Sequence, residues 1–286
     1  MSLHLLFLAA GTQSKAAVNM GVKQTGAGSS YVDLAWDAQL GAGHYHTQFS
    51  QDGKNWIDMD NSSSPSESVY NLTQGASYYA RVVAYKGSHY TGTHVMIGVS
   101  ETAIVSTKPT EVSGLTQTAA GVNSVSMSWN ASAGAASYVI YGYINYNWTQ
   151  IGTSATNSAT ITGVAATTST RFSVAAVKNV TGGTVTGDQC SGVEMKAIPI
   201  KVSRIAMQYY WDSLKEAKYI WTDVNNADGY QYEVKSANGK KTYFRATSTN
   251  SYTYVKPFPR GIFVKARVRA YVTVGNKVYY GAWSPY

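Results

Sequence analysis

Hydrophobic and polar residues alternate around three tryptophans of this chain. In the first stretch, Val32, Leu34 and Trp36 are separated by more polar positions, and residues 125–129 repeat the arrangement. A period of two is typical of a β-strand with one buried face. We therefore predict a strand that ends at each tryptophan, with the tryptophan itself in a hydrophobic core.

Each of these tryptophans is followed nine residues later by a tyrosine. The pairs are Trp36 with Tyr45, Trp129 with Tyr138, and Trp221 with Tyr230. The tryptophans lie 93 and then 92 residues apart (129 − 36 and 221 − 129). Solenoid repeats are only about 20–50 residues long. The spacing therefore predicts an array of three whole domains, in each of which the next strand starts at the tyrosine.

Turn signals and composition favour strands over helices along the whole chain. The turn signals are Asp52-Gly53, Asn238-Gly239 and, more weakly, Asn145-Tyr146-Asn147. The first two are typical of tight β-hairpins. Only 13% of the residues are charged, and the chain is rich in Ser, Thr, Gly and Tyr. Such a composition suits short strands and polar turns.

Together these features resemble three tandem fibronectin type III domains, over about residues 17–286. The resemblance implies an all-β fold of three tandem seven-stranded antiparallel sandwiches. It also implies that the three tryptophans lie on the second strand and the three tyrosines on the third. Tyr78 matches the tyrosine corner of the family, whereas the other two units have Thr170 and Val264 at the matching positions. The corner hydrogen bond is therefore expected in the first unit and is not predicted in the other two.

Two prolines mark the expected domain boundaries, because proline cannot donate a hydrogen bond to a strand ladder. Pro109 and Pro199 each precede an apolar stretch. The expected domains are residues 17–108, 109–199 and 200–286. The third has 16 residues after Ala270, whereas the other two have 25 and 23 residues from Ala84 and Ala176 to the next proline. The third sandwich is therefore expected to lack its last strand.

Residues 1–16 begin with an apolar run that has no place in the first domain. The run resembles a secretory signal peptide followed by small residues. The alternative is a donor strand that completes the third domain of the next molecule, which would build head-to-tail filaments. The donor residues would be Leu3, Leu5, Leu6, Phe7 and Leu8. Both interpretations stay open at the level of sequence.

Signatures of catalysis are missing from the sequence. It contains no nucleophile elbow, phosphate-binding loop, HExxH zinc motif or dinucleotide fingerprint. Cys190 is the single cysteine, so it forms no disulfide within the chain, and it lies in a different unit from the histidines. We therefore predict a protein that is not an enzyme and needs no cofactor.

Histidines are concentrated in the first unit. They are His44, His46, His89 and His94. The resemblance places the start of the third strand at the same end of the sandwich as the hairpin between the last two strands. The four imidazoles would then meet on one surface, where such nitrogen ligands bind zinc. The alternative is that they are ordinary surface histidines, because the sequence shows no supporting partners around them.

Positive charge is concentrated in the third unit. Residues 200–286 hold 14 Lys and Arg against 5 Asp and Glu, a net charge of +9, and the whole chain has +8. The predicted basic stripe consists of Lys240, Lys241, Arg245, Lys265, Arg267 and Arg269. Such a stripe attracts polyanions, for example wall teichoic acids or sulfated glycans. Nucleic acid is not favoured, because no recognition helix or stacking platform is evident. The alternative is a solvated surface that keeps the protein soluble.

The abundance of tyrosine is a third feature that could indicate a binding surface. The chain has 23, including Tyr141, Tyr143 and Tyr146 in one hairpin and Tyr279 and Tyr280 near the end. Exposed aromatic rings suit contacts with carbohydrate or protein. Tyrosine pairs across neighbouring strands also stabilise a sheet without binding anything.

The sequence therefore predicts a secreted or cell-surface protein of bacterial type, with roles in adhesion, ligand binding or spacing. Its partners would be proteins or glycans at the cell surface, or anionic polymers. The alternatives are a subunit of a filament assembled by strand donation and an accessory region that binds carbohydrate for a glycan-acting system.

Overall fold

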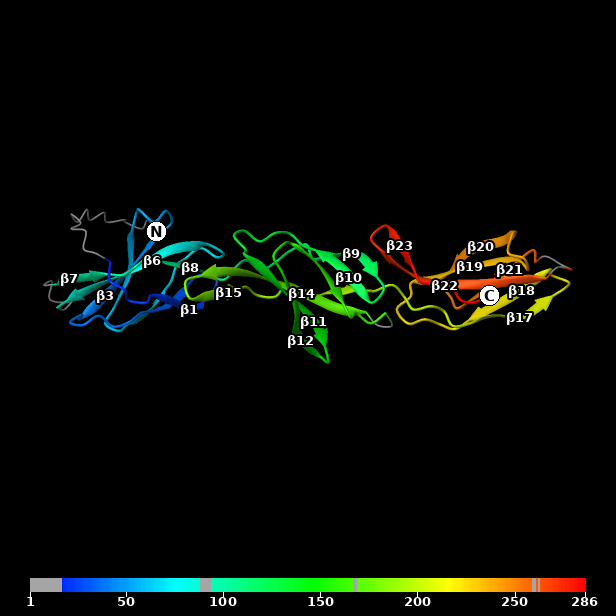
Figure 1. Ribbon diagram of the computed structural model, residues 1–286, viewed down its shortest axis with the longest axis horizontal. Helices are drawn as coiled ribbons and strands as arrows, with labels where there is room; N and C mark the ends of the chain where they lie inside the picture. The colour runs from blue at the N-terminus through cyan, green and yellow to red at the C-terminus, as the bar shows by residue number, and fades with distance from the viewer. Residues whose placement is uncertain (1–16, 88–93, 167–168, 259–260, 262) are drawn as a thin grey trace. The chain divides into compact units, whose positions relative to one another are not determined.

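The computed structural model describes residues 17–87, 94–166, 169–258, 261 and 263–286. The described residues form the strands β1 to β23 and no helix, which confirms the all-β fold (Figure 1). Among them, no helix is long and apolar enough to cross a membrane. Two compact units divide the chain: residues 1–110, 132–136 and 177–188 form one, and residues 111–131, 137–176 and 189–286 form the other. The three-domain boundaries stay a prediction.

The first sandwich consists of two antiparallel sheets. One has the order β1 (Lys23–Ala27), β2 (Val32–Ala35) and β5 (Ser66–Val69). The other has the order β4 (Ile57–Ser62), β3 (His44–Ser50), β6 (Ser77–Lys86) and β7 (Val95–Val99), and β8 (Ala103–Ser106) also pairs with β6. The last strand is therefore divided into two segments, β7 and β8, which both lie along β6.

The second sandwich repeats this topology. Its smaller sheet has the order β13 (Ser158–Thr162), β10 (Ser124–Ser128) and β9 (Thr116–Gly121). Its larger sheet has the order β12 (Asn147–Ser154), β11 (Ser137–Ile144), β14 (Thr170–Val180) and β15 (Gly183–Thr186), and β16 (Val193–Met195) also pairs with β14. The divided last strand is again present.

The third sandwich has the same strand order. Its smaller sheet consists of β17 (Ile205–Trp211), β18 (Glu216–Trp221) and β21 (Tyr252–Val255). Its larger sheet consists of β20 (Thr242–Ser248), β19 (Gly229–Ser236), β22 (Val264–Val274) and β23 (Lys277–Tyr280). The expectation that this sandwich lacks its last strand was wrong for the first segment, because β23 pairs with β22 from Tyr271↔Tyr280 to Val274↔Lys277. Among the described residues no second segment like β8 or β16 pairs with β22. Sixteen residues after Ala270 are enough for the first segment of a last strand that is divided in two.

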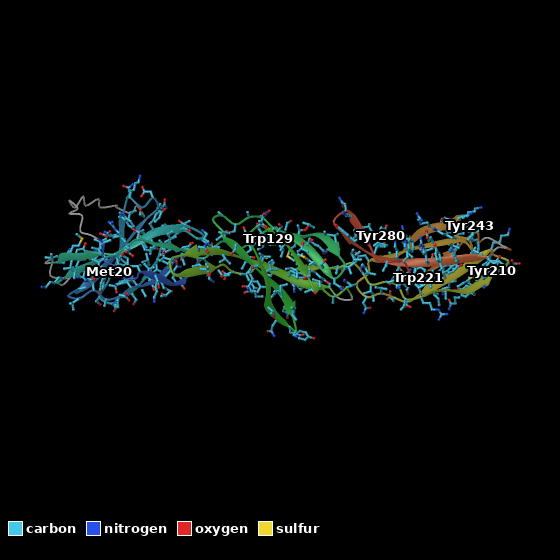
Figure 2. All side chains as sticks on the ribbon, in the orientation of Figure 1. Met20, Trp129, Tyr210, Trp221, Tyr243 and Tyr280 are labelled. Atoms are coloured by element: carbon cyan, nitrogen blue, oxygen red, sulfur yellow. The ribbon has the colours of Figure 1, made fainter. Side chains whose placement is uncertain are left out.

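Each core is organised around one tryptophan and one tyrosine from facing sheets. The ring centroids lie 5.4 Å apart for Trp36 and Tyr45, 5.2 Å for Trp129 and Tyr138, and 5.5 Å for Trp221 and Tyr230. All three pairs meet edge to face, a favoured geometry for aromatic rings. The labelled tryptophans in Figure 2 show where two of these pairs lie in their own sandwiches. The nine residues from each tryptophan to its tyrosine span the connection from the smaller sheet to the larger sheet.

The tyrosine hydroxyls hold the loops that follow the tryptophans. Tyr45 accepts a hydrogen bond from the backbone of Gln39 at 3.0 Å, and Tyr230 accepts one from Val224 at 2.8 Å. Elsewhere in the first sandwich, the backbone of Thr73 donates to the Tyr78 hydroxyl at 3.0 Å, which is the geometry of a tyrosine corner. Each ring therefore fills the core with its body and binds backbone with its hydroxyl.

A single residue after the first segment of the last strand makes the same pair of backbone hydrogen bonds in all three sandwiches. In the first, Ser100 donates its backbone N–H to Val82 O at 2.8 Å, and its Oγ accepts the Val82 N–H at 2.8 Å. Ser284 makes the same exchange with Val268 at 2.7 and 3.0 Å. In the second sandwich Cys190 takes this role, and its Sγ accepts the Val174 N–H at 3.3 Å. The cysteine is therefore a buried structural acceptor.

We expect Cys190→Ser to keep the stability of the second sandwich within about 1 kcal/mol, because a hydroxyl replaces the sulfur as acceptor. Cys190→Val removes the acceptor and leaves the buried Val174 N–H unsatisfied, which costs about 1–3 kcal/mol. Scanning calorimetry of the full chain measures both variants. Equal losses of stability in the two variants would contradict the assigned role of the sulfur.

Candidate polyanion-binding site

Strand β22 places three of the predicted basic residues on one face of the third sandwich. Its even-numbered residues from 266 to 270 belong to the hydrophobic core, so Lys265, Arg267 and Arg269 lie on the opposite face. The neighbouring strand β19 adds Gln231, Glu233 and Lys235 on the same side. The cross-strand pairs are Arg269↔Gln231, Arg267↔Glu233 and Lys265↔Lys235. We call this outer surface of β20, β19, β22 and β23 the basic face.

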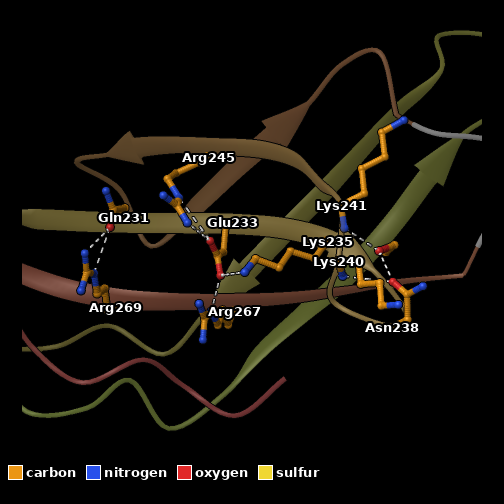
Figure 3. Close-up of polar contacts among 10 residues, drawn as sticks. Gln231, Glu233, Lys235, Asn238, Lys240, Lys241, Arg245, Arg267 and Arg269 are labelled. Carbon is orange, nitrogen blue, oxygen red and sulfur yellow. Dashed lines mark hydrogen bonds and ion pairs between the residues drawn. The ribbon is translucent and has the colours of Figure 1, made fainter.

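Glu233 is the centre of the basic face. Its side chain is 0% exposed and forms ion pairs with Arg245 at 2.7 Å, with Lys235 at 3.2 Å and with Arg267 (Figure 3). Burial alone would raise the pKa of the Glu233 carboxyl, but hydrogen bonds from Arg245, Arg267 and Lys235 outweigh it and hold the pKa below its ordinary value. The carboxylate is therefore charged at neutral pH and fixes the positions of three cations.

Arg269 is held by a neutral partner. Its Nε and Nη2 atoms donate to Gln231 Oε1 at 2.9 and 2.6 Å (Figure 3). No acidic residue lies opposite Arg269 on β19, so its charge is oriented without being neutralised. This arrangement keeps a guanidinium charge at a fixed place on the basic face.

Three aromatic rings from the end of the chain alternate with the basic side chains of β22. Along this cation–aromatic ladder, Lys265 Nζ lies 4.1 Å from the ring centre of Tyr286, and Arg267 Cζ lies 5.0 Å from Tyr286 and 4.4 Å from Trp283. Arg269 Cζ lies 4.5 Å from Trp283 and 3.9 Å from Tyr280. Each such contact stabilises by about 0.5–1 kcal/mol when it is exposed. The ladder therefore fastens residues 280–286 onto β22.

The remaining predicted residues lie around the turn that joins β19 to β20. Lys240 donates its backbone N–H to Asn238 Oδ1 at 3.0 Å, and Lys241 Nζ lies 4.9 Å from the ring centre of Tyr243. Lys265 approaches the same turn, because a Cβ placed on Gly239 would lie 3.2 Å from its Nζ. No salt bridge of Lys240, Lys241 or Lys265 occurs in the described part of the chain.

All six predicted basic residues therefore lie on one sheet, but they form two groups. Arg245, Arg267 and Arg269 are engaged by Glu233 or Gln231, and the three lysines surround the turn. Sequence reasoning missed Glu233 and Gln231, although their alternation along β19 was a usable signal. It also missed Trp283 and Tyr286 as ring partners of the arginines. Only the pairing of β19 with β22 shows that these residues meet.

The histidines of the first sandwich form a separate cluster around Tyr85. The ring of His44 stacks on Tyr85 at 5.2 Å, and His44 Nδ1 lies 3.1 Å from Gly87 O. The ring centres of His46 and His94 lie 4.9 and 5.0 Å from Tyr85. Among the described residues, no three His, Cys, Asp or Glu side chains are placed to hold a metal ion. His89 lies outside the described residues, and the zinc site stays a prediction.

The predicted donor-strand residues also lie outside the described residues. They are Leu3, Leu5, Leu6, Phe7 and Leu8, within residues 1–16. For the strand-donation hypothesis, the structure therefore describes the accepting sheet edge at β22 and not the donor segment. On that acceptor side, β23 already occupies the edge of β22 next to residues 271–274.

Comparison with known proteins adds the following. No protein-family model matches this chain, and no curated protein matches it. Among solved structures, it is similar to the crystal structure of the chicken CNTN1 FN1–FN3 domains, with 15% identity and a TM-score of 0.36 over 93% of this chain and 95% of that one. It is also similar to a two-domain fibronectin type III segment from chicken tenascin, with 17% identity and a TM-score of 0.32 over 62% of this chain and 97% of that one. Values this low carry no argument about function.

We expect Glu233→Gln to destabilise the third sandwich by about 2 kcal/mol at neutral pH, because Lys235, Arg245 and Arg267 lose the charged acceptor of their hydrogen bonds. The folded pKa of Glu233 is lowered, so its stabilisation is fully present above the ordinary carboxyl pKa and disappears as the pH falls through the folded value. The difference in melting temperature between wild type and variant should therefore shrink in acid. Calorimetry from pH 7 downward measures it.

The matched control is Glu216→Gln, which removes a partly exposed carboxylate from β18 of the same sandwich. We expect it to change stability by less than about 1 kcal/mol. A Glu233→Gln variant as stable as this control at pH 7 would contradict the central role of Glu233.

Proposed function

We propose that this chain is a non-catalytic extracellular module for adhesion or spacing, and that its third sandwich binds anionic polymers through the basic face. The observation that supports this proposal most directly is the excess of positive charge on that face. Seven cations stand against one carboxylate: Lys235, Lys240, Lys241, Arg245, Lys265, Arg267 and Arg269 against Glu233. The net charge of +6 belongs to one sheet surface of one sandwich.

The ordering of the arginines supports binding of a long polyanion. Arg267 and Arg269 are held between aromatic rings and by hydrogen bonds, so little side-chain entropy is lost when an anion approaches. The three lysines around the turn carry charges that no salt bridge neutralises in the described residues, and they provide the salt-sensitive attraction. A polymer that carries sulfate, phosphate or carboxylate groups at regular spacing is the partner that this surface suits.

The extracellular location and the spacer role have one support each. The apolar run in residues 1–16 resembles a secretory signal. The tandem sandwiches with short connections suit a spacer, because short links hold consecutive domains more firmly than flexible ones do. The bacterial origin remains part of the proposal.

The filament built by strand donation is the weaker alternative. Its premise was a third sandwich without its last strand, and β23 supplies the first segment of that strand. A donor strand would have only the short stretch of β22 before Val268 to pair with, because Ser284 engages the backbone of Val268 and β23 pairs with residues 271–274. We therefore favour the basic face over strand donation as the functional surface.

Charge reversal at the three lysines tests the proposal. We expect the triple variant Lys240→Glu, Lys241→Glu and Lys265→Glu to elute from heparin–agarose at roughly half the salt concentration that wild type needs, because screened attraction depends on local charge. Circular dichroism checks that the fold is kept, since these lysines make no salt bridge in the described residues.

The matched control reverses Lys23, Lys54 and Lys86, three exposed lysines of the first sandwich. It has the same net charge as the test variant and should elute close to wild type. Equal loss of retention in both variants would show that total charge, and not the basic face, determines binding. Unchanged retention of the test variant would refute the proposal.

A further inference from the structure

The hairpin formed by β11 and β12 projects from the second sandwich (Figure 1). Aromatic side chains at and beside its tip are exposed. Tyr146 is 89% exposed, Tyr143 40% and Trp148 36%. Large apolar side chains are usually exposed singly, and a group of them at one place indicates a contact surface. The surface belongs to a different sandwich from the basic face, so it calls for its own explanation.

Backbone conformation at the tip is strained. Asn145 and Tyr146 have φ angles of 50° and 64°. Asparagine tolerates the left-handed region, but a bulky tyrosine does so only at a cost. In the corresponding hairpins of the other two sandwiches, glycines occupy the left-handed positions, Gly53 with φ 71° and Gly239 with φ 74°. Tyr146 gains little packing in return, because almost all of its surface is exposed, and strain without local compensation points to function.

The rings beside the tip form a surface that is built before any ligand arrives. Tyr143 and Trp148 are directly paired across the two strands, with ring centres 5.3 Å apart in an edge-to-face arrangement. Trp148 lies over Gly192, where a Cβ would come within 2.7 Å of its ring. The absence of a side chain at Gly192 thus makes room for the indole. Tyr141 precedes Tyr143 on the same face of β11, so these rings line one face of the hairpin whose turn carries Tyr146.

The chemistry of this hairpin selects an uncharged ligand. Between Glu111 and Arg171 the sequence has no Asp, Glu, Lys, Arg or His. The nearest cation, Arg171, donates to the Gly192 carbonyl at 3.4 Å. An anionic lipid surface or polyanion would find no counter-charge on the hairpin. The exposed polar side chains of the hairpin carry amides and hydroxyls: Gln150 is paired with Tyr141 on the face of the rings, Asn145 lies in the turn, and Asn147 and Thr149 lie on the opposite face.

We propose that the β11–β12 hairpin is a binding tip for an uncharged polysaccharide, with Tyr146, Tyr143 and Trp148 as the stacking platform. A pyranose ring presents an apolar C–H face and a rim of hydroxyls, which match the aromatic rings and the neighbouring amides of Gln150 and Asn145. The hydrocarbon of a neutral bilayer would use the rings but leave the amides without partners. This site takes a different ligand class from that of the basic face and does not depend on it.

The test measures binding of the full chain by native affinity electrophoresis in gels that contain xyloglucan, mixed-linkage β-glucan or galactomannan, and by sedimentation with cellulose and chitin. We expect at least one of these polysaccharides to retain the wild type and Tyr146→Gly to weaken that binding by about tenfold. The same variant should melt about 2–4 °C higher, because glycine relieves the left-handed strain. A variant that is more stable and binds less cannot owe its loss to misfolding.

The control is Tyr70→Ala, which removes a tyrosine that is 56% exposed on the first sandwich and should leave binding unchanged. Three results would overturn the proposal. The first is that none of the five polysaccharides retains the wild type. The second is that Tyr146→Gly binds as tightly as wild type. The third is binding to neutral phosphatidylcholine vesicles that needs Tyr146, which would make the hairpin a membrane tip.

Discussion

The contact between one tryptophan and one tyrosine from facing sheets is the interaction on which each sandwich depends. In all three sandwiches the tryptophan ends a strand of the smaller sheet and the tyrosine lies on the next strand, in the larger sheet. Edge-to-face pairs of this kind add about 0.5–1.5 kcal/mol to the burial of the rings. Because the two residues lie on consecutive strands, their contact also sets how the chain crosses between sheets. The rest of each core, mainly Val and Ala, packs around this crossing.

In all three sandwiches the first segment of the last strand is followed by a residue whose side chain accepts a backbone N–H from the neighbouring strand, and a second segment follows in the first and second sandwiches. Serine does this in the first and third sandwiches, and Cys190 does it in the second. A free cysteine invites a reactive interpretation, but its burial and its hydrogen bonds place it within the backbone network. The partners are Val82, Val174 and Val268, so the two serines and the cysteine occupy equivalent positions in the three sandwiches.

The two proposed binding surfaces differ in how they use charge. On the basic face, a buried carboxylate and a ladder of rings position cations that would otherwise repel one another. On the β11–β12 hairpin, charge is absent and a strained turn presents rings to solvent. Buried ion pairs contribute little net stability, and left-handed tyrosine costs some. Both surfaces therefore depend on sandwich cores that are stable enough to carry them.

Sequence alone determined the all-β fold, the three-fold repeat and the alternation that puts Lys265, Arg267 and Arg269 on one face, because period and spacing are local properties of the chain. It did not show that Glu233 lies opposite Arg267, since strand pairing joins residues that are 34 positions apart. It also led to a wrong expectation for the last strand of the third sandwich, because a residue count cannot reveal a strand divided into two segments. The strain at Tyr146 likewise became visible only in the folded hairpin, where the turn between β11 and β12 forces both of its residues into the left-handed region.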